Sequence, residues 1–591
     1  MRTTRLAVST VGLMLMLVLG PAVEAQGTPT GVDTTKELPS VSSSHPWFAA
    51  APLPNDYVEH EFEISGTAGI YHYASPPPPP WTLEQDSVQP FTTRMLVRRP
   101  SDPARANGVV VVEWLNVTAG YDDDIEWQKV GDYFMRAGYT YIGVSAQQGG
   151  VNALQKWDAS RYADLNIADD GQSYDIMTQV AEAARAPASP LLGGITPRKI
   201  VATGVSQSAW RLVVYINTFH PLAHAYDGYF LHSRGRGVPP IQGTGVISDQ
   251  RPVPVSADAD APVFLLQTEG DLLGMDYAVA RQPDSELIHT WEVAGAPHVG
   301  AGSAYDIAVA SGIHARDVGG APGTPNPACQ PNPFPIWPVA DAAWDHLVTW
   351  MDYGTPPPTA PQIQLTRQPT LAAIPPGDGN SLIRRDELGN AEGGIRTPAI
   401  DAPVAAYFGS STCAPGLLGF LGGQYVPFDA PTLGRLYANH DDYVARVSTS
   451  ANRAVSDGFV LQDDADRLIA AAKASTIPSL AATQPTPPII QIHASLLTDR
   501  QSFALYTFDL DSPQTSACTA DCLNVWAPTL LESGDPVAPD GLPGKLGILV
   551  RPDGGRQVTY NGRPLYRYTG DLSAGQTTGD GVAGQWHIAV P

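Results

Sequence analysis

The sequence predicts an α/β fold, a mostly parallel sheet with flanking helices, followed by a small domain that is mainly β. Strongly apolar runs typical of buried parallel strands alternate with helical stretches through the first half of the chain. The last hundred or so residues instead show short alternating runs separated by turn residues. A chain of 591 residues is also too long for a single core, so at least two domains are expected.

The parallel strands are expected where apolar, β-prone residues cluster. They lie in NGVVVVEWL (107–115), GYTYIGVSAQ (138–147), RKIVATG (198–204), AYDGYFLHS (225–233), APVFLLQT (261–268) and LIHTWEVAG (287–295). Helical spacing predicts helices over 173–186, with Ser173 as a cap, and over 343–353, ended by Gly354. Helices between parallel strands cover both faces of such a sheet.

The first 25 residues have the pattern of a secretory signal peptide. A basic start precedes an uncharged apolar run from Leu6 to Leu19, and small residues favour cleavage after Ala25. The alternative, an uncleaved membrane anchor, is disfavoured because the apolar run is short for a span. We therefore expect a secreted or periplasmic protein with no membrane span after cleavage. Residues 26–45 are small and polar and are interpreted as a flexible leader.

The stretch GVSQS (204–208) leaves two interpretations open for Ser206. The serine follows a predicted strand and precedes a predicted helix, so it is either a nucleophile on a tight turn or an ordinary helix N-cap. A nucleophile turn needs small residues two positions before and after the serine. Gly204 fits, whereas Ser208 departs modestly from glycine. Ligands of open α/β sheets bind at the carboxyl ends of the strands, where Ser206 lies.

An acid and a histidine follow Ser206 in the order that this architecture uses. Asp271 comes directly after one strand, with Glu269 as the alternative acid, and His298 lies in a loop after the next strand. We predict that His298 takes the proton of Ser206 while Asp271 orients the imidazole.

Two backbone N–H groups are needed to bind the oxyanion formed in such a reaction. The first is expected from Gln207. The second is expected from the loop after the 107–115 strand, at Leu115 or Asn116, although that loop lacks a glycine-rich motif.

Several stretches resemble secreted, mostly bacterial α/β-hydrolase-domain proteins. They include VVVEWLNVTAG (110–120), GVSQSAWRLVVYIN (204–217), WEVAGAPHVG (291–300) and GGIRTPAIDAPVAAYFG (393–409). The resemblance covers 46–475, so it implies an α/β-hydrolase fold that includes 360–475 as a C-terminal extension. It also implies a serine hydrolase with Ser206, an acid near Asp271, and His298, without implying a substrate.

The tail resembles the secreted or lipoprotein-associated repeat of unknown function. The resemblance rests on CTADCLNVWAP (518–528), RQVTYNGRPLYRYTGD (556–571) and GDGVAGQWHIAVP (579–591), and it covers 490–591. Residues 476–489 are a linker by composition. The aromatic residues of this domain either pack as a β core, which we favour, or form a carbohydrate-binding face.

Four cysteines in an exported protein predict two disulfides. Cys518 and Cys522 are close in sequence, which leaves Cys329 to pair with Cys413. A metal site at the first two is disfavoured, because no second cysteine pair or spaced histidine pair lies nearby. No metal or cofactor is predicted.

Composition narrows the function. The net charge of −24 argues against nucleic-acid binding and against adhesion to anionic membranes. We predict an exported carboxylic-ester hydrolase with a Ser–His–Asp triad, acting on a small-molecule or polymeric ester, whose tail associates with the cell envelope. The alternatives are a peptidase or amidase using the same triad, and a non-catalytic envelope protein on a hydrolase-like scaffold.

Overall fold

The structure is a computed structural model. It describes residues 32–39, 53, 56–74, 83–243, 251–256, 259–300, 330–367, 382–411, 420–478, 489–493, 495–513, 515–531, 535–539, 541–552, 554–571 and 574–591. The predicted signal peptide and the predicted Cys329–Cys413 disulfide lie outside the described residues.

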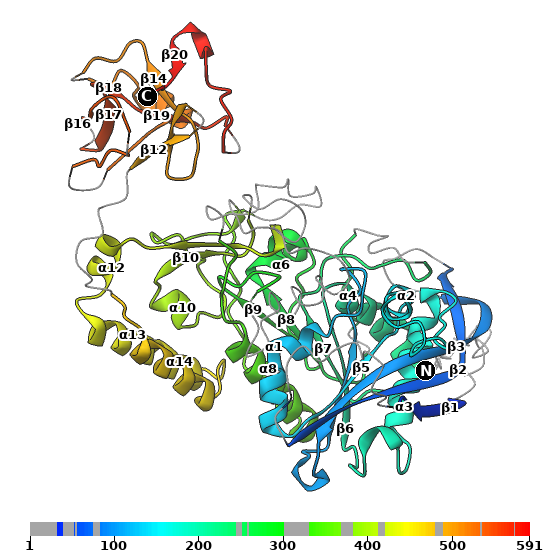
Figure 1. Ribbon diagram of the computed structural model, residues 1–591. Helices are drawn as coiled ribbons and strands as arrows, with labels where there is room; N and C mark the ends of the chain where they lie inside the picture. Colours follow the sequence, from blue (N-terminus) through cyan, green and yellow to red (C-terminus); the bar gives the residue numbers. More distant parts are fainter. Residues whose placement is uncertain are drawn as a thin grey trace, which may run out of the picture.

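A nine-stranded sheet forms the centre of the molecule (Figure 1), in the order β1-β2-β3-β5-β4-β6-β7-β8-β9. Strands β4 to β9 run parallel to one another, whereas the pairs β1–β2, β2–β3 and β3–β5 are antiparallel. The parallel strands are β4 (Val109–Trp114), β5 (Thr140–Val144), β6 (Lys199–Val205), β7 (Gly228–His232), β8 (Val263–Thr268) and β9 (Ile288–Val293). All six lie where the sequence predicts strands, so the predicted α/β fold class is confirmed.

The antiparallel edge was not predicted from the sequence. Strands β2 (Tyr57–Tyr73) and β3 (Leu83–Pro100) pair along almost their whole length. Strand β1 (Thr34–Glu37) adds to β2 with Thr34 opposite Ser65. The prediction of a flexible leader over 26–45 is therefore wrong for 34–37, where two threonines favour an edge strand and the neighbouring Leu38 is buried.

Helices cover both faces of the sheet. The helices of the body are α1 (Ile125–Ala137), α2 (Gln148–Trp157), α3 (Ser173–Arg185), α4 (Gln207–Val214), α5 (His220–Ala223), α6 (Glu269–Gly274) and α8 (Trp337–Tyr353). Val110 and Val112 of β4 pack in one apolar cluster with α3 and α4, and Val109 and Val111 pack in the other with α1 and α8. The uninterrupted valine run is explained because successive strand side chains enter opposite cores.

The extension beyond α8 packs onto the body. It contains α10 (Pro398–Asp401), β10 (Ala405–Phe408), β11 (Gln424–Pro427), α12 (Ala430–Leu436), α13 (His440–Ser456) and α14 (Gln462–Ala474). Ala454 and Ala465 enter the same apolar core as α1 and α8. Arg136 of α1 donates a 2.5 Å hydrogen bond to buried Asp464. The extension therefore shares a core with the body that the central sheet forms.

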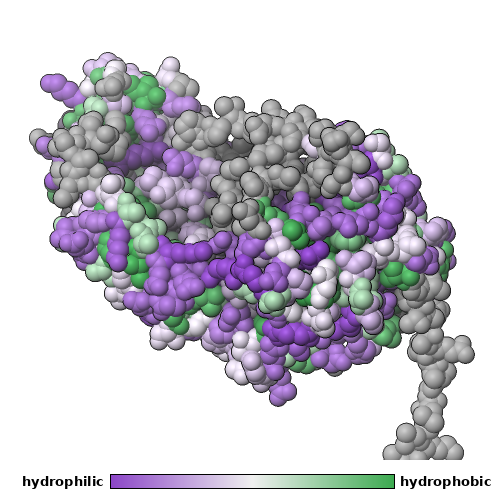
Figure 2. All heavy atoms as spheres, turned by 60° about the horizontal axis from the view of Figure 1, so that its bottom comes forward, coloured by the Kyte–Doolittle hydropathy of each residue, from purple (hydrophilic) through white to green (hydrophobic). Residues whose placement is uncertain are grey.

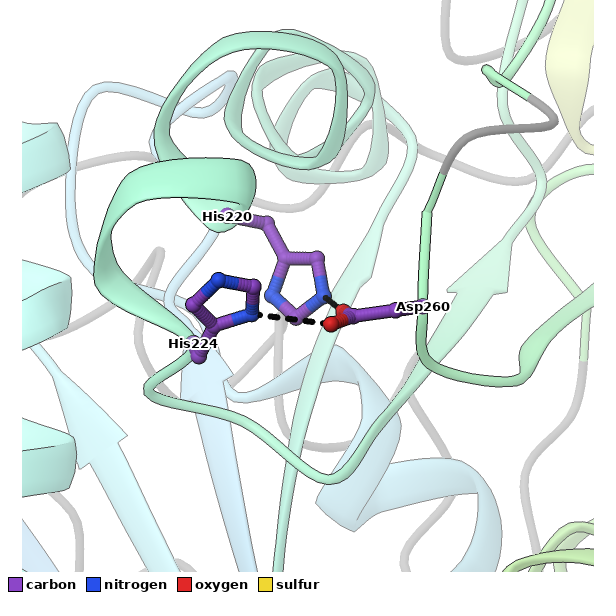
Figure 3. A group of neighbouring side chains, drawn as sticks. All are labelled: His220, His224 and Asp260. Atoms are coloured by element: carbon purple, nitrogen blue, oxygen red, sulfur yellow. Dashed lines mark hydrogen bonds and ion pairs between the residues drawn. The ribbon is translucent and has the colours of Figure 1, made fainter.

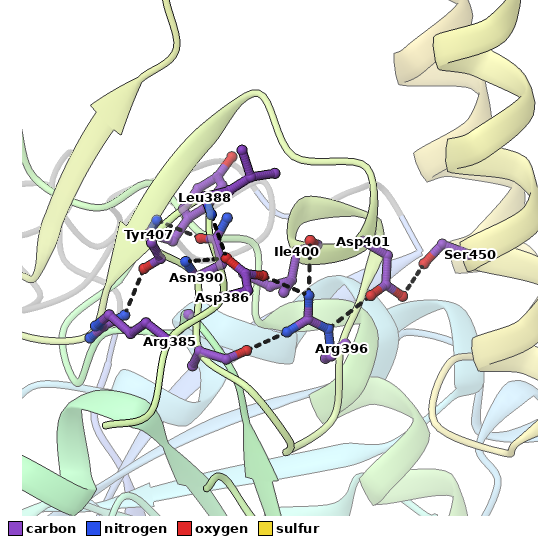
Figure 4. Close-up of polar contacts among 12 residues, drawn as sticks. Arg385, Asp386, Leu388, Asn390, Arg396, Ile400, Asp401, Tyr407 and Ser450 are labelled. Carbon is purple, nitrogen blue, oxygen red and sulfur yellow. Dashed lines mark hydrogen bonds and ion pairs between the residues drawn. The ribbon is translucent and has the colours of Figure 1, made fainter. Parts of the chain in front are cut away.

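Polar contacts also fasten the extension to itself (Figure 4). Asp401 accepts hydrogen bonds from Arg396 and from Ser450 of α13, both at 2.9 Å. Asp386 accepts the backbone N–H groups of Leu388 and Asn390, which closes the preceding turn. These contacts fix the position of the loop that carries Arg385.

The C-terminal domain is built from short antiparallel strands. They are β12 (Ile490–His493), β13 (Leu496–Asp499), β14 (Leu505–Phe508), β15 (Trp526–Pro528), β16 (Leu546–Val550), β17 (Arg556–Tyr560), β18 (Arg563–Pro564), β19 (Tyr566–Tyr568) and β20 (Trp586–Ile588). Asn561 and Gly562 both have positive φ in the turn between β17 and β18, as a tight hairpin requires. The predicted small domain that is mainly β is confirmed.

The aromatic side chains of this domain form its core. Trp526 and Trp586 stack with ring centroids 3.7 Å apart, and both are buried. Phe508 stacks on the other side of Trp586 at 4.2 Å. The expected Cys518–Cys522 disulfide is present beside them. These rings therefore pack against each other, as the preferred interpretation holds, and do not form an exposed binding face.

The surface is mixed in character. On the face shown in Figure 2, hydrophobic residues occur in small groups among more numerous hydrophilic ones. Within the part of the chain that the structure describes, no helix combines the length and the apolar character needed to cross a membrane.

Candidate active site

Ser206 occupies a strained turn between β6 and α4. Strand β6 ends at Val205 and α4 begins at Gln207, so the serine alone makes the connection. Its φ of 58° and ψ of −119° are unfavourable for a residue with a Cβ atom. Its side chain makes no capping hydrogen bond to α4. The N-cap interpretation is therefore wrong, and the turn instead presents the Ser206 hydroxyl at the carboxyl edge of the sheet.

Close packing explains the small residues around this turn. A Cβ atom at Gly204 would lie 2.9 Å from the carbonyl carbon and the Cβ of Ser208. The strand and the helix therefore approach each other too closely for any residue but glycine at position 204. Ser208 itself is fully buried at the second position and fits there, so the departure from glycine does not disturb the turn.

The structure brings Ser206, His298 and Asp271 together from the three segments that follow β6, β9 and β8. The Nε2 atom of His298 lies 3.0 Å from the Ser206 Oγ, and its Nδ1 atom lies 2.5 Å from the Asp271 Oδ1. His298 is 5% exposed and Asp271 is fully buried. The three side chains thus form one continuous hydrogen-bonded chain at the carboxyl ends of β6, β8 and β9.

Asp271 is held by the first turn of α6. Its Oδ2 accepts the backbone N–H of Thr268 at 2.6 Å, and its own N–H donates to the Thr268 hydroxyl. Burial alone would raise the pKa of this carboxyl, but the His298 imidazole and the Thr268 N–H lower it below its usual value. One Asp271 oxygen is therefore fixed by the backbone, and the other faces the His298 Nδ1.

The alternative acid, Glu269, is fully engaged elsewhere. Its carboxylate accepts hydrogen bonds from Arg385 at 2.6 Å and from the backbone N–H groups of Gly295 and Gly409 at 2.9 and 3.0 Å. It therefore ties the loop before His298 to the extension. The structure places Asp271, and not Glu269, against the imidazole.

The two residues chosen for the second oxyanion donor are not available. The Leu115 N–H donates to the Val144 carbonyl, and the Asn116 N–H donates to the Asp123 carbonyl. The Asn116 side chain is also used, since it donates to the Val205 carbonyl next to Ser206. The prediction is wrong because backbone hydrogen bonding continues past the end of β4 and engages both N–H groups. The predicted first donor, the Gln207 N–H, lies in the first turn of α4, where helix N–H groups have no intrahelical partner.

A buried group of titratable side chains beneath the site was not predicted from the sequence. His232 ends β7, and its Nδ1 lies 2.7 Å from the Glu126 carboxylate, which also accepts the Trp344 indole N–H. Lys129, one turn along α1 from Glu126, is fully buried with them. Burial lowers the pKa of both Lys129 and His232. No local motif identifies this group, because α1, β7 and α8 bring its members together over more than 200 residues.

The solved structures to which part of the chain is similar include three hydrolases. An α/β serine hydrolase without lid from Xanthomonas campestris is 12% identical, over 40% of this chain and 92% of that one, with a TM-score of 0.24. An esterase from Rhizomucor miehei is 14% identical over 42% and 77%, with a TM-score of 0.25. A dienelactone hydrolase from Anabaena variabilis is 12% identical over 34% and 77%, with a TM-score of 0.21. No curated protein sequence matches the chain.

Family models match both parts of the chain. A model described as a secreted repeat of unknown function matches residues 547–590, which is compatible with export. A model described as an alpha/beta hydrolase domain matches residues 28–470. The second match spans most of the chain and includes the antiparallel edge, the parallel sheet and the extension. The chain therefore belongs to the α/β hydrolase domain family.

Proposed function

We propose that the protein is an exported serine hydrolase that cleaves carboxylic esters through an acyl-enzyme intermediate. One observation carries the proposal: Ser206, on a strained turn, is hydrogen-bonded to His298, which is hydrogen-bonded to buried Asp271. A nucleophile, a base and an orienting acid in this geometry are what acyl transfer requires. The N-terminal apolar pattern and the secreted-repeat match support export.

The reaction begins when the Ser206 Oγ attacks the ester carbonyl carbon. The His298 Nε2 takes the hydroxyl proton, and Asp271 stabilises the resulting imidazolium through Nδ1. The tetrahedral intermediate collapses when the bond to the alcohol oxygen breaks and His298 returns the proton to that oxygen. A water molecule then repeats the sequence on the acyl-enzyme, releasing the carboxylic acid and restoring Ser206.

The oxyanion is bound by backbone N–H groups beside Ser206. The Gln207 N–H is the first donor in this proposal. We propose the backbone N–H of Val117, the residue after Asn116, as the second donor. Within the described chain this N–H donates no hydrogen bond. The Asn116 side chain fixes this loop against Val205, so the loop can keep a donor near the reacting carbonyl without a glycine-rich motif.

Turnover of nitrophenyl esters of graded acyl length tests the proposal. The chain from residue 26 onward should hydrolyse at least the short-chain esters, and Ser206→Ala should lower kcat by about 10⁴-fold or more. Ser208→Ala is the matched control, because it removes a buried hydroxyl from the same helix and should keep turnover. Nitroanilides of the same acyl groups, measured in parallel, separate ester from amide preference.

Loss of turnover in both serine variants, or in neither, would contradict the assignment of Ser206. No turnover of any ester, together with no reaction of Ser206 with a fluorophosphonate, would favour a non-catalytic scaffold.

A further inference from the structure

A second group of histidine and aspartate side chains lies away from the candidate active site (Figure 3). The His220 Nε2 lies 2.6 Å from one carboxylate oxygen of Asp260, and the His224 Nδ1 lies 3.0 Å from the other. One nitrogen from each histidine and an Asp260 oxygen all lie within 4.8 Å of one another. Two imidazoles therefore converge on a single carboxylate.

The fold places this group at the edge of the sheet formed by the amino ends of the parallel strands, whereas Ser206 lies at the opposite edge, formed by their carboxyl ends. His220 and His224 belong to α5 and its C-cap, directly before β7 begins, and Asp260 lies directly before β8 begins. Ser206 instead follows the carboxyl end of β6, which runs parallel to β7. Since β7 has five residues, the two edges are about 16 Å apart. The group is therefore not part of the candidate active site.

The second ring nitrogen of His220 has its own partner. Its Nδ1 lies 2.9 Å from the hydroxyl of Tyr229, which is buried in β7. Without a metal, the Nε2–H donates to Asp260. When a metal ion takes the place of that proton, Nδ1 carries the ring proton and donates it to the Tyr229 hydroxyl. Histidines that bind metals are usually oriented in this way by a hydrogen bond at the other ring nitrogen.

We propose that His220, His224 and Asp260 form a binding site for a divalent transition-metal ion, with Zn²⁺ the ion that the donors fit best. Two imidazole nitrogens and one carboxylate oxygen are ordinary zinc ligands. The side chains of His224 and Asp260 are 56% and 61% exposed, so a water molecule can occupy a fourth position. Their exposure also lets both side chains adjust toward the spacing that tetrahedral coordination requires.

Such an ion would stabilise the fold. It would join the end of α5 to the segment that leads into β8. Without the ion, the exposed side chains of His224 and Asp260 share only a surface ion pair. Because the unfolded chain offers no assembled site, metal binding would favour the folded state. The proposal does not depend on the proposed hydrolase function.

Zinc titration of the untagged chain from residue 26, after removal of metals with EDTA, tests the site. Calorimetry should detect one tight equivalent of Zn²⁺, which raises Tm by a few degrees. His224→Ala and Asp260→Asn should each weaken binding by at least about 100-fold, and Tyr229→Phe by about 10-fold, because it removes only the orienting hydroxyl. His60→Ala is the matched control. It removes a partly exposed histidine that is paired with one carboxylate, Glu37, and should bind zinc as the parent does.

Equal zinc affinity in the parent chain and in His224→Ala would overturn the proposal, as would zinc binding with no rise in Tm. Co²⁺ provides a test that needs no variant. The loaded parent chain should show the visible absorption of four-coordinate Co²⁺ in an environment of nitrogen and oxygen donors. A spectrum like that of hydrated Co²⁺ would also overturn the proposal.

Discussion

The two edges of the central sheet each carry a histidine hydrogen-bonded to an aspartate, and the two pairs differ in what surrounds them. His298 and Asp271 are 2.5 Å apart, and His220 and Asp260 are 2.6 Å apart. The second ring nitrogen of His298 meets the hydroxyl of Ser206 on a strained turn, whereas that of His220 meets a tyrosine in the core. A histidine–aspartate pair therefore gains a catalytic geometry only from the third group it meets.

The carboxylates differ as much as the third groups do. Asp271 is fully buried, and its second oxygen is fixed by the Thr268 N–H. The Asp260 side chain is 61% exposed. An interaction with a charged imidazole is stronger where water is excluded, so Asp271 is suited to stabilise an imidazolium. Asp260 is exposed to solvent, so it is better suited to give up its hydrogen bond with His220 and bind a metal ion.

The largest expected effect comes from making the same change in both pairs. Asp271→Asn should lower kcat for a nitrophenyl ester by about 10⁴-fold, because the amide no longer favours the required tautomer of His298. Asp260→Asn should change zinc affinity and should cause no fall in kcat of this size. Similar losses of kcat in the two variants would break the distinction between the two edges.

Glu269 tests whether a position beside the candidate active site is enough for a catalytic role. Glu269→Gln should destabilise the fold by about 3 kcal/mol, because it leaves Arg385 without its carboxylate partner. The loss of kcat in the folded variant should be far smaller than that of Asp271→Asn.

Urea unfolding of Glu269→Gln, Arg385→Gln and the double variant provides the measurement. The double variant should lose less stability than the sum of the two single variants, because both single changes remove one interaction. A fall in kcat for Glu269→Gln that matches or exceeds that of Asp271→Asn would reverse the assignment of the acid.

The two edges should also respond at different pH. Burial lowers the pKa of folded His220 below the value of about 6.5 expected in the unfolded chain, so the unfolded state binds more protons just below that pH. Stability should therefore fall as pH drops below about 6.5, by at most about 1.4 kcal/mol per pH unit for this group. The depressed pKa of Asp271 contributes stability that is present above about pH 4 and is lost only below it.

The difference in unfolding free energy between the parent chain and His220→Gln, measured in EDTA from pH 5 to 8, isolates the contribution of His220 from those of other titrating groups. A constant difference over that range would contradict it.

The smallest effect concerns the backbone strain at Ser206, whose φ of 58° and ψ of −119° lie outside the left-handed helical region that His224 occupies at the opposite edge. Ser206→Gly should stabilise the fold by about 1 kcal/mol, because glycine adopts a φ of 58° without the penalty of a Cβ atom. Ser206→Ala keeps the Cβ and should leave stability close to that of the parent. Equal stabilities of the glycine and alanine variants in urea would argue that the turn is not strained.

Much of this arrangement could be predicted from the sequence, because it depends on local pattern. The valine run of β4, the strand before Ser206 and the order of Ser206, Asp271 and His298 all follow from apolar periodicity and chain order. Chain order places each residue at the end of a strand, and parallel strands bring their carboxyl ends to one edge. The contact of Asp271 with His298 follows the same logic.

What could not be predicted depends on contacts between distant segments. The engagement of Glu269 could not be predicted, because it depends on Arg385, more than a hundred residues away. The availability of the Leu115 and Asn116 N–H groups depends on how far a ladder extends beyond β4. The spacing of His220 and His224 was visible in the sequence, but the third ligand, Asp260, is supplied by the fold.

We propose that Ser206 is made nucleophilic by its turn and by His298, and that no other serine among the described residues is. Labelling with a fluorophosphonate, followed by mass spectrometry of the labelled peptide, tests it most directly. The account predicts that the label attaches at Ser206 in the folded chain, is lost in Ser206→Ala and in urea, and forms far more slowly in Asp271→Asn. Labelling at another serine, or ester turnover that persists while Ser206 stays unlabelled, would contradict it.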